Sequence, residues 1–153
     1  MLTTPLPELR HLPRDEWVAA LTDRYWSGLP GFLDYEVLEL RPGQIEARLS
    51  LRPELMLAEG DYLHAGTVVA FADSCAGWGC LASLPDGAVA FTTSELKINL
   101  VGTTRAPDAL VCMATLMHSG RSMQVWDATV TRESDDRPIA HFRCTQYLLA
   151  EPR

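Results

Sequence analysis

The longest apolar stretch of the chain covers residues 65–84 and contains a single charged residue, Asp73. Its sequence, AGTVVAFADSCAGWGCLASL, places small and apolar side chains nearly all round a helix of 3.6 residues per turn. Such a helix is enclosed by other elements instead of lying on a surface. The breakers Pro85, Asp86 and Gly87 indicate where it ends. The pattern therefore predicts one long buried helix that carries an acid.

Before this helix, the pattern predicts a surface helix and a hairpin. Apolar residues recur at four-residue spacing over about residues 15–27, which predicts an N-terminal helix ended by a cluster of glycine and proline. Strand-like segments at residues 35–41 and 44–51 flank Pro42-Gly43, which is typical of a hairpin with a tight turn. Residues 52–63 are expected to form a loop that leads into the buried helix.

The second half of the chain alternates apolar and polar residues with a period of two. This alternation predicts strands at residues 93–101, 109–117, 124–132 and 139–149. In the first of them, Leu96, Ile98 and Leu100 alternate with polar residues, which predicts one buried and one exposed face. The short connections favour antiparallel neighbours, because a parallel crossover needs a dozen or more residues. We therefore expect an α+β domain in which a curved antiparallel sheet wraps one long apolar helix.

Composition limits the class of protein. A chain of 153 residues with 47% hydrophobic content can bury one core, so we expect a single domain over residues 1–153 with its core at about 33–149. The net charge of −7 argues against a nucleic-acid binder, which needs a clustered basic face. The N-terminus has prolines and charges where a secretory signal needs an apolar run. A cytoplasmic protein without a membrane anchor is expected.

The cysteines and histidines do not indicate a metal site. All four cysteines lie in apolar segments without metal-site spacing, so they are interpreted as core residues: Cys75, Cys80, Cys112 and Cys144. The four histidines are scattered over different elements, and no serine elbow or Cys/His/Asn pattern is present. We expect no metal and no cofactor.

Asp73 is the strongest candidate for chemistry. An ionised group in a buried segment is costly unless it is paired, so an acid inside a core helix needs a reason. One interpretation is a local cap or ion pair. The other is a catalytic acid whose pKa is raised by desolvation.

Two motifs resemble a known family. The sequence LHAGT at residues 63–67, followed by Asp73 seven positions after Gly66, resembles the hotdog-fold acyl-CoA thioesterases of the 4-hydroxybenzoyl-CoA and phenylacetate-degradation type. In that family the central helix opens with His-Gly-Gly and carries Asp or Glu about two turns later. The run TSELKINL at residues 93–100 resembles the family's long central strand. The resemblance covers about residues 33–149 and implies the hotdog fold.

The resemblance assigns roles to particular residues. Asp73 would be the general base or the nucleophile, and the backbone N–H groups of Ala65 and Gly66 at the helix N-terminus would stabilise the oxyanion. His64 would orient the loop or bind substrate, or else only cap the helix. The other candidates for substrate binding are Thr92, Thr93 and Ser94 near the acyl group and Arg121 at the CoA phosphates.

Two positions depart from the family pattern. Ala65 replaces the first motif glycine, but it keeps a backbone N–H that can serve as a donor. Ala58 stands where the family often has Asn or Gln, fifteen residues before the acid. Glu59 or Asp61 could take over that role, or the water could be held in another way.

The implied function is hydrolysis of a small aryl or medium-chain acyl-CoA at an interface between two copies of the chain. A homo-oligomer, either a dimer or a dimer of dimers such as a homotetramer, is expected, because the strand at residues 93–101 would pair edge to edge with its copy. Two alternatives stay open. They are a non-catalytic acyl-CoA-binding hotdog protein and a hotdog hydratase or dehydratase, although the His-Phe-Pro-Gly motif of the latter is not found.

Overall fold

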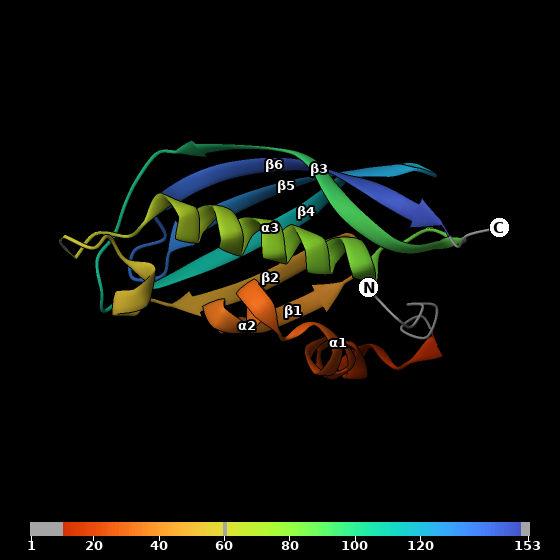
Figure 1. The fold of residues 1–153 in the computed structure, drawn as a ribbon, viewed down its shortest axis with the longest axis horizontal. Coiled ribbons are helices and arrows are strands. Elements are labelled where there is room, and N and C mark those ends of the chain that lie inside the picture. The colour runs from red at the N-terminus through yellow and green to blue at the C-terminus, as the bar shows by residue number, and fades with distance from the viewer. Residues whose placement is uncertain (1–10, 60, 151–153) are drawn as a thin grey trace.

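The computed structural model describes residues 11–59 and 61–150, and it contains one antiparallel sheet of six strands packed against one long helix (Figure 1). The helical elements are η2 Arg14–Glu16, α1 Trp17–Tyr25, α2 Gly28–Leu33, η3 Pro53–Leu55 and α3 Ala65–Ala82. The strands are β1 Glu36–Arg41, β2 Gln44–Ser50, β3 Ala88–Leu100, β4 Ala109–Ser119, β5 Met123–Arg132 and β6 Pro138–Ala150. Their order across the sheet is β1-β2-β4-β5-β6-β3, and every neighbouring pair is antiparallel. The predicted hotdog arrangement is confirmed.

Helix α3 supplies the centre of the core. Its side chains Val68, Phe71, Ala72 and Cys75 are all 1% exposed or less. Gly79 lets the helix approach the sheet closely, since an added Cβ would come within 2.7 Å of a ring carbon of Trp126 on β5. By length and composition alone α3 is apolar enough to cross a membrane, but more than half of it is buried inside the protein, as in a core helix. The predicted buried helix is confirmed.

Strand β3 differs from its prediction. It begins at Ala88, five residues earlier than expected, and its inner face is not fully buried. Leu96 and Leu100 pair in register with the buried Cys144 and Ala140 of β6, yet they are 40% and 46% exposed. The expectation of one buried face was therefore wrong for this half of the strand. The reason is position, because β3 is an edge strand and its side chains have a neighbouring strand on one side only.

The N-terminal region contains a helix that the sequence pattern did not predict. The predicted first helix is found as η2 and α1, but the glycine and proline residues after it form the short helix α2. Pro30 is tolerated because it lies in the first turn, where the backbone N–H has no helical acceptor. Gly31 is needed for close approach, since a Cβ there would come within 2.7 Å of the carbonyl oxygen of Trp26. Helix α2 packs beside α3 (Figure 1).

Candidate active site

Asp73 projects from the middle of α3 and is half-buried. The Thr93 hydroxyl on β3 donates a hydrogen bond to Asp73 Oδ1 at 3.0 Å. Burial raises the pKa of Asp73 above its usual value, and the hydrogen bond from Thr93 only partly offsets this effect. No ion pair to Asp73 is found among the described residues, so the local-pairing interpretation reduces to a single hydrogen bond. A carboxyl group whose pKa is raised by burial beside a cavity is a candidate for proton transfer in catalysis.

An apolar cavity of about 320 Å³ lies beside the Asp73 carboxylate. Its walls come from α3, β3 and the N-terminal helices α1 and α2: Tyr25, Leu29, Pro30, Asp73, Ser74, Gly77, Trp78, Leu81 and Phe91. A largely apolar pocket with a few converging polar groups is the usual form of a small-molecule site. The cavity can therefore take an apolar group of a substrate next to the acid.

Only one of the three candidate hydroxyls on β3 reaches Asp73. Thr93 points inward, where its oxygen also lies 3.0 Å from Oε1 of Gln146 on β6. Thr92 and Ser94 are exposed, and the Ser94 hydroxyl donates to the backbone oxygen of Thr145 at 3.1 Å. The structure thus brings Thr93 together with the acid and leaves its two neighbours outside the cavity.

The N-terminus of α3 is capped by His64, the residue that directly precedes the helix. His64 Nδ1 accepts a hydrogen bond from the Gly66 N–H at 2.9 Å, and His64 O accepts from the Thr67 N–H at 3.0 Å. The Ala65 N–H lies in the same first turn, and within the described ranges it has no hydrogen-bond acceptor. Of the two predicted oxyanion donors, Ala65 is therefore the one left open, while Gly66 is held by the cap.

A second cavity, of about 390 Å³, opens at this helix start. Its lining includes His64, Gly66, Thr67 and Ala70 from α3 and Leu29 from α2. Leu29 lines both cavities, so α2 separates the helix start from the pocket beside the acid.

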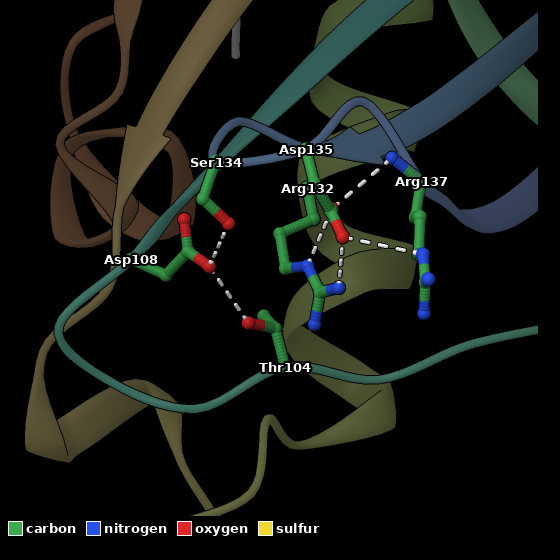
Figure 2. Close-up of polar contacts among 6 residues, drawn as sticks. All are labelled: Thr104, Asp108, Arg132, Ser134, Asp135 and Arg137. Atoms are coloured by element: carbon green, nitrogen blue, oxygen red, sulfur yellow. Dashed lines mark hydrogen bonds and ion pairs between the residues drawn. The ribbon is translucent and has the colours of Figure 1, made fainter.

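Polar contacts hold the loop that leads into α3. The Leu63 N–H donates to Thr104 O at 3.0 Å, which ties this loop to the segment after β3. The hydroxyls of Thr104 and Ser134 both donate to Asp108 Oδ2, at 3.0 and 2.9 Å (Figure 2). The neighbouring turn is closed by ion pairs from Asp135 to Arg132 and Arg137. These hydrogen bonds connect the loop before α3, through the segment between β3 and β4, to the turn between β5 and β6.

Distance along α3 separates the two chemical features. Ala65 and Asp73 are eight residues apart, which is about 12 Å along a helix. One thioester carbonyl therefore cannot touch the Ala65 N–H and the Asp73 carboxylate of the same chain. If both act on one substrate, they must come from two copies of the chain.

The structure does not bring the remaining candidates to Asp73. Arg121 is exposed and lines a cavity of about 570 Å³ with Asp86 and Gly87, beyond the C-terminal end of α3. Ala58, Glu59 and Asp61 lie in the exposed loop before α3, and none of them lines the cavity beside the acid.

The cysteines match their interpretation as core residues, since all four are buried and free. Among the described residues no group of three histidine, cysteine or acidic side chains could hold a metal ion.

Sequence reasoning missed Gln146 and the contribution of α2. Gln146 is 0% exposed and follows Phe142 and Cys144 at the inward positions of β6. A glutamine at an inward position of an alternating strand is the signal that could have identified it. No comparable signal existed for Leu29, because a short helix rich in glycine and proline has no recognisable pattern.

Comparison with known proteins gives a consistent result. The family model of the Thioesterase superfamily matches residues 60–139. A curated relative, 1,4-dihydroxy-2-naphthoyl-CoA hydrolase of Listeria monocytogenes serotype 1/2a (strain 10403S), is 26% identical over 118 residues, which cover 77% of this chain and 93% of the relative.

Solved structures share the fold. A hypothetical thioesterase of Streptococcus pneumoniae TIGR4, solved with coenzyme A, matches with a TM-score of 0.75 and 18% identity over 87% of this chain and 99% of that one. The Escherichia coli PaaI protein from the phenylacetic acid degradation operon matches with a TM-score of 0.77 and 16% identity over 90% of this chain and 96% of that one.

Proposed function

Because the chain belongs to the Thioesterase superfamily and is a thioester hydrolase, we propose that it hydrolyses acyl-CoA with Asp73 as the general base. The observation that carries this proposal is the half-buried carboxylate of Asp73, which Thr93 orients toward an apolar cavity. Asp73 takes a proton from water as the water oxygen attacks the thioester carbon. The C–S bond then breaks, and the proton passes to the departing thiolate, so Asp73 is ionised again.

The developing oxyanion needs a donor at the other side of the carbonyl. The Ala65 N–H supplies it, supported by the positive end of the α3 dipole. Because Asp73 and Ala65 of one chain are too far apart, the site is completed by a second copy, and the acid of one protomer faces the helix start of its partner.

The free edge of β3 is the surface through which two copies would join. Its second half exposes Leu96 and Leu100, at 40% and 46%, and Val101 directly after the strand is 56% exposed. Strand β1, the other edge, has six residues with a register shift between Val37 and Glu39. Strand β3 has thirteen residues, and its two register shifts, at Ala88/Ala90 and Thr93/Glu95, both come before Leu96. Long flat apolar edges pair with another strand, and bulges discourage this.

Leu96→Lys is expected to convert the oligomer into monomers, because it places a charge on the inner face of the pairing strand. Leu38→Lys on β1 is the matched control, since Leu38 is 47% exposed on the opposite edge. Sedimentation velocity at micromolar concentration measures the result. A wild-type monomer, or equal dissociation by both variants, would contradict pairing through β3.

The cavity beside Asp73 is the proposed site of the acyl group. Its walls are aromatic and apolar, which fits a small aryl or medium-chain acyl group, and the Listeria relative is named for a naphthoyl substrate. Gly77 forms part of the floor and lies against Phe91, so the space above this glycine is part of the acyl site.

Gly77→Ala is expected to lower kcat/KM for an aryl-CoA at least about tenfold relative to acetyl-CoA, the usual scale for one carbon in an apolar pocket. An added Cβ would lie 2.9 Å from Phe91 Cζ, so the ring must shift, and both residues line the cavity. The ratio of the two substrates on the same preparation removes any effect of the folded fraction. An unchanged ratio would place the acyl group elsewhere.

Arg121→Ala is expected to raise KM for acyl-CoA with little change in kcat, because a phosphate contact is made equally in the ground and transition states. Hydrolysis of an acyl-pantetheine, which lacks the nucleotide, should not change. Arg105→Ala is the companion variant, because Arg105 is exposed and stacks on Tyr62 next to the helix start. If only Arg105→Ala raises KM for acyl-CoA, the nucleotide binds at the N-terminal end of α3 and not at Arg121.

A turnover assay on aryl, medium-chain and enoyl-CoA substrates tests the proposal as a whole. We expect release of free CoA thiol. Hydration of the enoyl-CoA would indicate a hydratase, and binding without turnover would indicate a non-catalytic acyl-CoA-binding protein.

A further inference from the structure

Gln146 is a buried polar residue that the mechanism above does not use. It lies on β6, is 0% exposed, and places its carboxamide oxygen 3.0 Å from the Thr93 hydroxyl. Its nitrogen donates to the Cys144 sulfur at 3.3 Å. The Thr93 hydroxyl therefore contacts both the Asp73 carboxylate and the Gln146 carboxamide.

The number of hydrogen bonds that Asp73, Thr93 and Gln146 can form together depends on whether Asp73 is protonated. A hydroxyl has one proton to donate, but Thr93 lies 3.0 Å from two acceptor oxygens, one of Asp73 and one of Gln146. If Asp73 is ionised, Thr93 can satisfy only one of them. If Asp73 is protonated, its own O–H donates to Thr93, and Thr93 donates to Gln146, so every contact is a hydrogen bond.

We propose that Gln146 is a positioning residue that acts on Asp73 through Thr93, by accepting a hydrogen bond from the Thr93 hydroxyl whenever Asp73 holds a proton. The proposal rests on the role of Asp73 as base. As the water proton reaches Asp73, the Thr93 O–H turns from Asp73 to Gln146, and no covalent bond other than those of the hydrolysis changes. When Asp73 loses its proton, the Thr93 O–H turns back.

No competing charge faces Asp73 in the part of the chain that the structure describes. The thiol of Cys144 on β6 is neutral, because burial raises its pKa to about 12. Tyr25 of α1 and Ser74 of α3 are the other polar side chains that line the same cavity. Burial favours the protonated form of Asp73, and the direction of the Thr93 hydrogen bond is the local polar contact that can strengthen or oppose this preference.

Gln146→Met tests this role, because methionine keeps the length of the side chain and removes both polar atoms. Without its acceptor, Thr93 donates to Asp73 permanently and favours the carboxylate. The Asp73 carboxyl, followed by ¹³C NMR in the full chain, should titrate about one pH unit lower, the size of one net hydrogen bond. The acid limb of the kcat/KM profile should move by the same amount, and kcat should fall about tenfold.

Gln124→Met is the matched control. Gln124 pairs in register with Gln146 and is also 0% exposed, but it bonds Ser83 O and the Trp126 indole instead of Thr93. It should lower stability without moving the Asp73 titration. An equal shift in both variants, or no shift with Gln146→Met, would overturn the proposal.

Thr93→Val supplies a second test that does not depend on the stability of one variant. In that background the hydroxyl is absent, so adding Gln146→Met should leave the Asp73 titration where it is. A further shift would overturn the proposal. The NMR titration of Asp73 does not depend on catalysis, so it tests the role of Gln146 separately from the proposed function. Failure of the proposed function would instead appear as full activity in Asp73→Asn.

Discussion

Asp73→Asn is expected to lower kcat by about a hundredfold or more, the scale of losing general-base catalysis, while the protein stays folded. The asparagine amide has nearly the same shape and can still contact Thr93, but it cannot take a proton from water. Steady-state kinetics on the best substrate of the acyl-CoA panel measures the loss. Turnover close to wild type would show that Asp73 is not the base.

The same substitution is expected to keep or raise the free energy of unfolding at neutral pH. The folded protein raises the pKa of Asp73 through burial, so ionised Asp73 costs stability as pH rises from the unfolded pKa through the folded one. Asparagine removes this cost. Its advantage should therefore be present at neutral pH and disappear at low pH, where Asp73 is protonated in both states.

Asp127→Asn gives the opposite pH dependence and serves as the control. Asp127 pairs with Arg143 on the outer face of the sheet, and this hydrogen bond lowers the pKa of Asp127. Its contribution to stability is present above the unfolded pKa and is lost as pH falls, so the substitution should destabilise only at higher pH, with kcat unchanged. Urea unfolding at several pH values compares the two variants. If Asp73→Asn destabilises at neutral pH and keeps its turnover, Asp73 is a structural residue.

The elements of the fold follow from local sequence patterns, and for that reason most could be predicted. The run around Asp73 is apolar on all sides, and the strands alternate with a period of two. The exposure of Leu96 could not be predicted, because alternation shows which side chains share a face but not whether another element covers that face. Position at the edge of a sheet is a property of the whole topology.

The candidate site shows the same limit. Asp73 and the helix start are local features, since one breaks an apolar helix and the other begins it. Gln146 reaches Asp73 only through the pairing of β6 with β3, which joins residues more than fifty positions apart. Capping by His64 was one of the two roles expected from the sequence, but the choice of Gly66 as the capped residue could not be predicted, because it depends on how the His64 ring is turned. Contacts of this kind are set by tertiary geometry.

Ala65→Pro is expected to lower kcat about a hundredfold or more, because it removes the N–H that we propose as the oxyanion donor and little else. Proline is favoured at the first position of a helix, and His64 has φ −74° and ψ 131°, a conformation that a residue before proline adopts readily. The melting temperature should therefore stay close to wild type. Ala65→Ser, which keeps the N–H, is the control and should remain active.

Mixing the two inactive variants tests whether the site is shared between protomers. In a hybrid of Asp73→Asn and Ala65→Pro chains, one site carries both changes and the other has the intact acid of one protomer and the intact amide of its partner. Refolding an equal mixture should restore about a quarter of wild-type activity, since half of the dimers are hybrids with one good site each. Recovery is impossible if each chain supplies both groups to its own site. A mixture that exchanges subunits and stays inactive would therefore contradict the shared site. The oxyanion donor would then have to be another group near Asp73 of the same chain.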